Sequence, residues 1–350
     1  MKWYVWTIIA ALWYCYVQTF IDPSQLPLVI PGIYGYPVIV VLALVTLFFF
    51  LFFKQRILFL LLMLLPVYYF LSVSLRPSFF SGEKNGGSDY SFSLLSFNAH
   101  FFRPKQTYDD FSVEMINWVV EDSSDILCIQ EFCTANRWEP LAVELQILNS
   151  GRQLAFQDLK LPHSKFKMGM AVATKFDILH SELYRLGDSS EHAIQMVDLL
   201  IRRDTLRVFN VHLSSPQING AMEISGETGF FESVYHHIRI LFDTEVQRSA
   251  EIRLLKSLIE ASPYAVLVAG DFNQLAYGFN YRRMSRPLKD AFLQKGEGLG
   301  ITLNKNNLPL RIDYQWYDPN LSLESFEVDY TMDHSDHYPL RASYRFLEDK

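Results

Sequence analysis

The chain has 350 residues, of which 50% are apolar, and its 31 basic and 38 acidic residues give a net charge of −7 at pH 7. Its three cysteines show no metal-finger spacing. An excess of acidic residues argues against sequence-independent binding of polyanions such as nucleic acid, because such binding depends on lysine and arginine side chains that neutralise phosphates.

Three nearly continuous apolar runs occupy the first 75 residues, at 3–20, 37–53 and 57–75. Each is close to the ~20 residues that an α-helix needs to cross the hydrocarbon core of a bilayer. We therefore expect three transmembrane helices in a membrane anchor over residues 1–80. The first run could instead be a signal peptide, but it lacks a small-residue cleavage site, and two further apolar runs follow it. Pro66 lies inside the third run, where a neighbouring helix can satisfy the carbonyl that the proline frees.

Basic residues in the short flanks predict the orientation of this anchor, because cytoplasmic flanks are enriched in them. Lys2 precedes the first run, and Lys54 and Arg56 lie between the second and third, whereas the loop 21–36 contains no lysine or arginine. Arg76 and Lys84 follow the third run, so the basic residues on the expected cytoplasmic side outnumber those on the other side by only three to two. The pattern predicts a multi-pass membrane protein with a cytoplasmic N-terminus and an extracytoplasmic chain after Arg76.

A polar, glycine-rich tether at 81–90 leads into one domain at 91–350, which has 26 basic and 35 acidic residues and a net charge of −9. Short β-like runs recur in this domain, at 93–97, 125–129, 169–174, 193–201, 206–212, 265–269, 311–314 and 325–330. A disulfide bond between Cys128 and Cys133 could form in an oxidising compartment, but a strand would point Cys128 into the core. Because strands outnumber helices and alternate with them irregularly, we expect an α+β sandwich rather than a doubly wound parallel sheet.

Two amphipathic helices are expected between these strands, at 109–120 and 244–261. A capping-box signal formed by Thr244 and Gln247 places the start of the second helix. The stretch 214–239 before it has no clear periodicity and exceeds an ordinary connection, yet it is rich in aromatic residues. We expect it to be a functional lip or a disordered segment.

Several strand-like runs end in polar residues suited to phosphoester chemistry. They deliver Asn98, Glu131, His212, the pair Asp271 and Asn273, and the pair Asp336 and His337. Hydrolysis of a phosphoester needs neutralisation of the phosphoryl charge, an activated water and help for the leaving oxygen. So many polar strand ends in one chain predict one metal-centred phosphoester site.

The residue types suggest roles. Mg²⁺ prefers oxygen ligands and keeps several waters, so Glu131, at the end of an apolar strand, is the expected first ligand. Asp271 and Asn273 would point the same way if the strand continues past Phe272, which lets the carboxylate orient water while the amide donates to a phosphate oxygen.

The two histidines His212 and His337 are natural donors to a transition state, and each needs a carboxylate to fix its tautomer. Asp313 is the candidate partner for His337. Taken singly, each of these residues also has an ordinary explanation as a turn, a strand end or a satisfied histidine, and it is their joint occurrence that points to a site. Four other histidines have no such supporting pattern and are expected to be ordinary surface or rim residues: His100, His180, His192 and His334.

The order of these motifs resembles the endonuclease/exonuclease/phosphatase superfamily, which includes deoxyribonuclease I, abasic-site endonucleases, neutral sphingomyelinases and inositol-polyphosphate 5-phosphatases. The resemblance spans about 91–346 and rests on Asn98, Gln130-Glu131, Gly169-Met-Ala-Val, Asn210-Val-His212-Leu, Gly270-Asp271-Phe-Asn273, Arg311-Ile-Asp313-Tyr and Ser335-Asp336-His337. It implies a four-layer α/β/β/α sandwich with the site at one edge of the paired sheets.

The resemblance also implies roles for each residue. Glu131 would bind Mg²⁺, with Mn²⁺ as an alternative and Asn98 beside it, and Asp271 would orient the attacking water. Asn273 and His212 would hold the phosphate. His337, paired with Asp313, would stabilise the transition state, and Asp336 would tune His337 or join the metal site. The anchor and the segments 290–292 and 298–302 resemble membrane-tethered bacterial members, which implies a bacterial inner or plasma membrane. Abasic-site enzymes lack a histidine at the position of His212, and the tract 274–277 matches no known substrate-reading loop, so the substrate class stays open.

Three hypotheses follow. The first is a membrane-tethered, Mg²⁺-dependent phosphoesterase acting on a phosphodiester or phosphomonoester, such as a lipid headgroup. The second is a metal-dependent nuclease of the same fold, for which a cationic groove would be needed from Lys165, Lys167, Arg282, Arg283 and Arg286. The third is a catalytically silent membrane scaffold. The lipid bilayer and a phosphoester are the expected partners, and nucleic acid is less favoured because the domain is acidic.

Overall fold

The computed structural model describes residues 3–50, 56–77, 91–104, 111–135, 142–161, 166–187, 191–216, 230–305 and 309–347. The chain divides into two compact units. Unit 1 comprises Met1–Leu75, Ser214–Leu254 and Leu275–Met284, and unit 2 comprises Arg76–Leu213, Leu255–Gln274 and Ser285–Lys350. The predicted tether 81–90 lies outside the described residues, as does the part 217–229 of the predicted lip.

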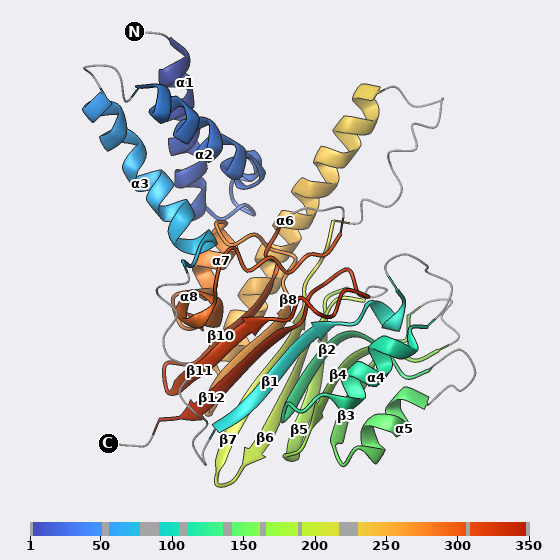
Figure 1. Cartoon of the computed structure of the whole chain (residues 1–350). Helices are drawn as coiled ribbons and strands as arrows, with labels where there is room; N and C mark the ends of the chain where they lie inside the picture. Colours follow the sequence, from blue (N-terminus) through green and yellow to red (C-terminus); the bar gives the residue numbers. More distant parts are fainter. Residues whose placement is uncertain are drawn as a thin grey trace. The chain divides into compact units, whose positions relative to one another are not determined.

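Unit 2 is built on two six-stranded sheets (Figure 1). The first sheet has the order β11-β12-β1-β2-β4-β3, and the second has the order β5-β6-β7-β8-β10-β9. The strands of the first sheet are β1 (Ser91–Asn98), β2 (Ile126–Cys133), β3 (Gln153–Asp158), β4 (Met168–Thr174), β11 (Leu321–Val328) and β12 (Leu340–Phe346). Those of the second are β5 (Asp177–Arg185), β6 (Ala193–Ile201), β7 (Asp204–His212), β8 (Ala265–Asp271), β9 (Lys289–Asp290) and β10 (Asp313–Tyr317).

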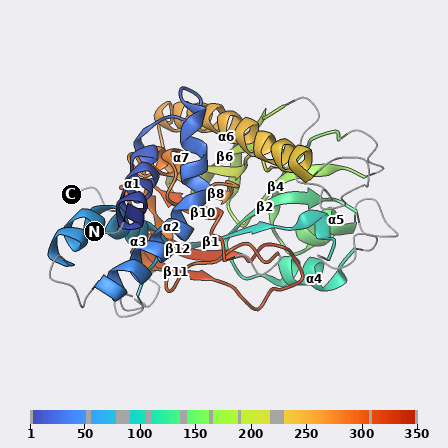
Figure 2. The same cartoon turned by 90° about the horizontal axis from the view of Figure 1, so that it is seen from above.

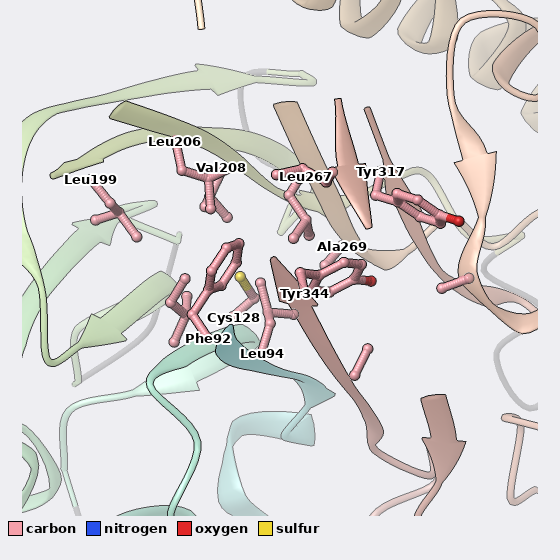
Figure 3. Packing of buried hydrophobic residues seen from close by; sticks show 14 of the residues in the cluster. Phe92, Leu94, Cys128, Leu199, Leu206, Val208, Leu267, Ala269, Tyr317 and Tyr344 are labelled. Carbon is pink, nitrogen blue, oxygen red and sulfur yellow. The ribbon is translucent and has the colours of Figure 1, made fainter. Parts of the chain in front are cut away.

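The main core lies between the two sheets. Alternate residues of β1, Phe92 and Leu94, pack in one cluster with Val208 of β7 and Leu267 of β8, so the cluster draws on both sheets (Figure 3). Cys128 belongs to the same cluster, as its place on a strand predicts, and it is a buried free thiol, as is Cys133. The two sheets therefore form a sandwich, which confirms the expected mixed α+β class.

Helices cover the outer face of the first sheet. The intervening residues of β1, Leu95 and Phe97, cluster with buried side chains of α4 (Val113–Glu121) and α5 (Ala142–Asn149). Both views show these two helices against the same sheet (Figures 1 and 2). Both faces of β1 are thus buried, which explains why its sequence is apolar without strict alternation. The other short helices of unit 2 are η4 (His100–Phe102) and α8 (Ala291–Lys295).

The sequence did not predict the two-residue strand β9, and it also missed the longer strands β3, β5 and β12. Their sequences mix polar and apolar residues, and β5 is an edge strand with mostly exposed side chains. Such strands lack the continuous apolar run that marks a strand buried on both faces. The helix expected at 109–120 is α4, and it starts at Val113 because the Ser112 hydroxyl accepts a hydrogen bond from the Met115 amide at 3.2 Å.

The helix expected at 244–261 begins a full 14 residues earlier, as α6 (Phe230–Glu260). Thr244 lies inside α6, where its hydroxyl donates to the Ile240 carbonyl at 2.8 Å, so the capping-box prediction was wrong. A hydroxyl that bonds back to the preceding turn is compatible with a helix interior. The described end of the predicted lip, from Phe230, is therefore helical.

Unit 1 contains the three apolar helices α1 (Trp3–Val17), α2 (Ile30–Phe50) and α3 (Arg56–Ser74), with η1 (Gln18–Phe20), η2 (Pro27–Val29) and α7 (Phe279–Met284). The Trp13 indole of α1 donates to the Leu62 carbonyl at 2.9 Å. That carbonyl lies four residues before Pro66 and is the one that the proline leaves without an amide partner. The prediction that a neighbouring helix satisfies it is confirmed.

Among the described residues, one helical stretch, Pro27–Phe48, is long and apolar enough to cross a membrane, and the apolar part of α3, Leu60–Ser74, is shorter. This finding supports one of the three expected spans. The first apolar run is interrupted because its α-helix ends at Val17 and continues as a 3₁₀ turn. Its 15 α-helical residues rise roughly 22 Å, less than the ~30 Å hydrocarbon core.

Candidate active site

Strand pairing in unit 2 brings the predicted strand ends to one edge of the sandwich. In the second sheet, His212 of β7 is the register partner of Asp271 of β8, and Asp271 is the partner of Asp313 of β10. In the first sheet, Asn98 of β1 lies beside Gln130 of β2. Because β1 and β2 run parallel, as do β7 and β8, the carboxyl ends of each pair finish together.

Glu131 reaches this edge from an irregular point of β2. Its φ is +48°, and β2 carries a bulge opposite β4 at this point. One Glu131 carboxylate oxygen accepts a hydrogen bond from Asn98 Nδ2 at 3.1 Å and lies 3.6 Å from His212 Nε2. Asn98 thus uses its amide nitrogen toward the carboxylate, while its Oδ1 accepts from the His100 backbone N–H.

Asp271 lies at the centre of the group. Its Oδ2 accepts from Asn98 Nδ2 at 3.2 Å, and its Oδ1 accepts from the Asn273 backbone N–H at 2.8 Å. Only glycine fits at the preceding position, Gly270, because its φ is +144° and a Cβ there would lie 2.0 Å from the Val211 carbonyl oxygen. The glycine permits the close approach of β8 to β7 that sets Asp271 beside His212.

Asn273 does not continue the strand. β8 ends at Asp271, and Asn273 takes a φ of +48°. Its side-chain amide donates to the Leu213 carbonyl at 3.0 Å and to Asp271 Oδ2 at 3.2 Å. The turn therefore keeps Asn273 at the site by hydrogen bonds to Asp271 and to the end of β7, instead of by strand alternation.

His337 and Asp313 form the predicted pair. His337 Nδ1 donates to Asp313 Oδ2 at 2.9 Å, and His337 Nε2 lies 3.6 Å from Asp271 Oδ2. Ser335 locks this loop to the first sheet, since its hydroxyl donates to the Asn98 carbonyl at 2.8 Å. The imidazole is thereby held between two carboxylates from neighbouring strands of the second sheet.

Burial shifts the protonation of the two carboxylates. Burial raises the pKa of Glu131 to about 8, with repulsion from Glu191 and Asp336 adding to it. Burial also raises the pKa of Asp271 to about 7, although the charge of His337 opposes the shift. Both groups would gain from a nearby positive charge.

The imidazoles respond in opposite directions. Burial lowers the pKa of His212 well below its usual value, and repulsion from His192 and His337 adds to this. Burial also disfavours the charged form of His337, but Asp313 and Asp271 outweigh it and raise its pKa well above the usual value. His337 is therefore a cationic donor at neutral pH, while His212 is neutral.

Asp336 lies at the rim of the group. Its Oδ2 is 3.6 Å from Lys305 Nζ. Burial acts to raise its pKa, but the charges of His337, His100 and Lys305 outweigh this and lower it. Asp336 is thus an anionic neighbour of His337.

The ligand atoms of Asp271, Asp313 and His337 lie within 4.8 Å of one another, a spacing that could also hold a metal ion. The Asp313 carboxylate is bonded to the His337 ring, so a metal ion held by this trio would have to replace that hydrogen bond.

Two of the histidines expected to be ordinary surface or rim residues, His100 and His192, lie at the site instead. His192 is buried, and its ring stacks edge-on against His212 with centroids 4.9 Å apart. His100 sits two residues after Asn98 on a turn of positive φ and bonds the Arg103 carbonyl through Nδ1. Only their nearness in sequence to β1 and β6 could have signalled this. His180 and His334 are on the surface, as expected.

Two of the residues expected to form a nuclease groove, Arg282 and Arg283, make contacts within unit 1. Arg282 and Arg283 belong to unit 1, where the Arg282 guanidinium lies 4.0 Å from the centre of the Phe20 ring and Arg283 lies 3.6 Å from Asp22. Lys165 lies outside the described residues. These contacts engage two of the five residues within unit 1, and the nuclease hypothesis stays a prediction for Lys167 and Arg286.

A model of the endonuclease/exonuclease/phosphatase family matches residues 95–337, which is more than half of the chain. The chain belongs to this family. No curated protein sequence matches it. The matched range contains every residue of the site described above, from Asn98 to His337.

Solved structures support the family fold. An endonuclease/exonuclease/phosphatase from Beutenbergia cavernae DSM 12333 aligns with a TM-score of 0.53 and 13% identity over 73% of this chain and 72% of that chain. A family protein from Leptotrichia buccalis C-1013-b gives 0.53 and 16% over 73% and 100%. D. rerio TDP2, humanized by 14 mutations, gives 0.52 and 14% over 73% and 99%. At these identities the likeness concerns the fold alone.

Proposed function

We propose that this family member is a membrane-anchored, divalent-metal-dependent hydrolase of a phosphodiester or phosphomonoester, with a lipid headgroup as the favoured substrate class. One observation carries the proposal. Glu131 and Asn98 of the first sheet meet His212, Asp271 and Asp313 of the second sheet, and His337 joins them from the loop before β12. Such a set offers a metal ligand, a base and cationic and neutral donors within one buried group.

The donor set fits a hard divalent cation. Glu131 presents a carboxylate that burial makes hard to ionise, and a nearby cation would relieve that cost. Oxygen ligands of this kind suit Mg²⁺ or Mn²⁺, and no thiolate lies among them. Glu131 would hold the ion, Asn98 would orient Glu131 through its amide, and Asp336 would add negative charge nearby. The chemistry that such an ion supplies is neutralisation of charge on the phosphoryl oxygens.

Asp271 is placed to receive a proton from the attacking water. A pKa of about 7 lets it act as a base at neutral pH and hold the proton afterwards. The Asn273 backbone N–H and the Asn98 side chain fix the two carboxylate oxygens, so the base is oriented before substrate binds.

His337 would donate to a phosphoryl oxygen as negative charge develops there. Asp313 fixes its ring and keeps it protonated, so Nε2 remains a donor. His212, neutral and buried, would donate from the other side, with Asn273 beside it. Two donors on a pre-arranged edge can favour the transition state over the ground state.

Membrane anchoring is supported by the two faces of α2. Ile33, Val40 and Ala43 are buried, whereas Val38, at 60% exposure, and Phe48, at 61%, face outward. A helix that is apolar on all sides belongs in a protein core or a bilayer, and the outward face excludes the core. α3 repeats the pattern, with Leu61, Leu64 and Tyr68 exposed. We therefore propose a three-span anchor in which α2 and α3 each cross the bilayer, and α1, too short by itself, crosses together with η1, whose 3₁₀ turn adds roughly 6 Å.

Three spans from a cytoplasmic N-terminus place unit 2 outside the cytoplasm. A C-terminal alkaline phosphatase fusion of the full chain is then active, and a green fluorescent protein fusion is dark. The reverse pattern would show that an even number of segments spans the membrane or that the basic residues around Lys54 do not set the orientation.

The substrate class is tested with the purified full chain in detergent and Mg²⁺. The panel consists of sphingomyelin, phosphatidyl headgroups, inositol phosphates and DNA, with Asp271→Asn as the control for contaminating enzymes. We expect one lipid class to be hydrolysed by the wild-type chain and not by the variant. Hydrolysis of DNA alone would support the nuclease hypothesis, and inactivity on all four would support the scaffold hypothesis.

A further inference from the structure

The bulge in β2 creates a problem for the backbone that carries Glu131. Pairing between β2 and β4 is regular up to Ile129 opposite Ala171 and resumes with Phe132 opposite Gly169, so β2 holds one extra residue. Bulges interrupt the ladder of backbone hydrogen bonds. Ile129, Gln130 and Phe132 around the bulge are fully buried, and an unpaired carbonyl there is costly.

A side chain from the opposite sheet compensates for the interruption. Asn210 of β7 is fully buried, and its Nδ2 donates to the Ile129 carbonyl at 3.1 Å and to the Ala171 carbonyl at 3.1 Å. These are the two residues that form the last regular pair before the bulge. The Asn210 Oδ1 accepts from Gln130 Nε2 at 2.6 Å, which ties the first residue of the bulge to the same amide.

We propose that Asn210 is a positioning residue, which fixes Glu131 for metal binding by holding the β2 bulge from across the sandwich. The inference rests on the proposed function insofar as Glu131 binds the metal. Asn210 lies two residues before His212 on the same strand, so a single strand of the second sheet supplies one site residue and sets the backbone of another in the first sheet.

The bulge matters because of the period of a strand. In a regular strand, successive side chains point to opposite faces, so removal of one extra residue moves every later side chain to the other face. Without Asn210, β2 could recover regular pairing with β4, and Glu131 would leave the positive φ that turns it to the edge. Its contacts with Asn98 and His212 would then be lost.

The test compares two buried amides that both bridge the sheets. Asn210→Leu removes the amide at the bulge. Gln315→Leu removes an equally buried amide of β10, whose Nε2 donates to the Leu340 carbonyl at 2.9 Å and whose Oε1 accepts from the Tyr344 hydroxyl at 2.8 Å. Both substitutions leave buried polar groups without partners, so both should lower the unfolding temperature of the full chain.

Only Asn210→Leu should change the metal site. We expect its Mn²⁺ affinity, measured by calorimetry on the full chain in detergent, to fall at least about tenfold, as for other residues that orient a ligand. Gln315→Leu should stay within about twofold of the wild type. A crystal structure of metal-free Asn210→Leu should show regular β2–β4 pairing and a negative φ at Glu131. If Asn210→Leu does not fold, Asn210→Ser, which keeps one hydroxyl donor, should show the same changes in weaker form.

The outcomes are separable. Equal loss of Mn²⁺ affinity in both variants, or an unchanged bulge in the Asn210 variants, would overturn the inference. A lost bulge with unchanged Mn²⁺ affinity would overturn it too. If the wild-type chain itself binds no Mn²⁺, the metal assignment of the proposed function fails, and the structure of the metal-free variant still decides whether Asn210 holds the bulge.

Discussion

The two units use the same apolar residue types in opposite ways. In unit 2, Leu94 and Leu267 are fully buried between two sheets. In unit 1, Leu61 is 59% exposed and Leu64 57% exposed, on helices whose other faces are packed. Single exposed leucines are ordinary, but a contiguous apolar face is typical of a surface that contacts lipid or another protein. The difference teaches that apolar composition alone does not separate a core from an exposed surface, whereas burial does, and the exposed faces of unit 1 are the ones that the proposed anchor would turn to lipid.

The polar residues show the converse. In unit 2, the carboxylates of Glu131, Asp271 and Asp313 gather at one edge, where Glu131 and Asp271 accept hydrogen bonds from Asn98 and Asp313 accepts one from His337. Small changes at that edge should abolish catalysis, while comparable changes on the exposed face of unit 1 should act only on contact with the bilayer. The predictions below test this contrast from the largest expected effect to the smallest.

The largest effect should follow from changing single groups at the edge. Asp271→Asn removes the base and His337→Ala removes the cationic donor, and each should lower kcat at least about 10²-fold, the usual size of such contributions. His180→Ala, an exposed histidine on β5, serves as the control and should leave kcat unchanged. Wild-type turnover in Asp271→Asn or His337→Ala, with metal and substrate present, would remove that residue from the mechanism.

A matched pair of leucines tests the contrast in burial directly. Leu267→Ala leaves a cavity between the sheets and should lower the free energy of unfolding by roughly 2–5 kcal/mol. Leu61→Ala, on the exposed face of α3, should change it by less than about 0.5 kcal/mol. Chemical denaturation of the full chain in detergent measures both. Equal losses would mean that α3 packs against protein on that face.

The N-terminal half of α6 provides a test at intermediate size. Tyr235 is 67% exposed, and Ile238 lies one turn further on the same side, also exposed. If this side contacts lipid, Tyr235→Ser with Ile238→Ser should raise KM for a membrane-presented substrate at least about tenfold, since even one side chain that enters lipid contributes about 1.5 kcal/mol or more. Turnover of a small soluble phosphodiester should not change.

The exposed polar residue His236 supplies the control for that experiment, because His236→Ser alters the same turn without removing apolar surface. It should leave KM unchanged on both substrates. Equal losses on both substrates in the Tyr235 and Ile238 double variant would instead identify this part of α6 as structural. No loss on either would show that it takes no part in substrate selection.

The smallest effect concerns pH and a surface carboxylate far from the chemistry. Burial alone would raise the pKa of Asp125, but hydrogen bonds from Ser93 and the ammonium group of Lys175 outweigh it and lower the pKa below its ordinary value of 3.8. The stabilisation is therefore fully present above pH 3.8 and is lost as pH falls through the lower native pKa.

Asp125→Asn should accordingly reduce the free energy of unfolding by less than about 1 kcal/mol at pH 7. The difference from the wild type should shrink below pH 3.8. Denaturant titrations across that range measure it. A difference that stays constant with pH would mean that the carboxylate acts through packing or neutral hydrogen bonds instead of through its charge.

Much of the site could be predicted because the end of a buried strand can be recognised in the sequence. An apolar run that stops at Asp271 or Glu131 signals a polar group at the rim of a sheet, and the register then brings such ends together. The same logic found His337 and its partner Asp313. The wrong start of α6 and the missed strands β3, β5 and β12 share a cause, since their apolar residues are too few or too irregular to show a period.

Other features depend on backbone geometry that no local pattern announces. Nothing in the run before Glu131 predicts a bulge, because the residue with positive φ is neither glycine nor asparagine. Asn273 was expected to follow strand alternation and instead turns back on Asp271. The inter-sheet role of Asn210 is likewise invisible in sequence, since its partners lie on strands β2 and β4 far along the chain.

The most direct test of the central claim is the metal dependence of hydrolysis by the purified full chain, with Glu131→Gln measured beside it. The account predicts that excess chelator abolishes hydrolysis, that Mg²⁺ or Mn²⁺ restores it, and that Glu131→Gln needs at least about tenfold more metal for half-maximal rate. Full activity of the wild-type chain in excess chelator, or a metal requirement unchanged in Glu131→Gln, would contradict it.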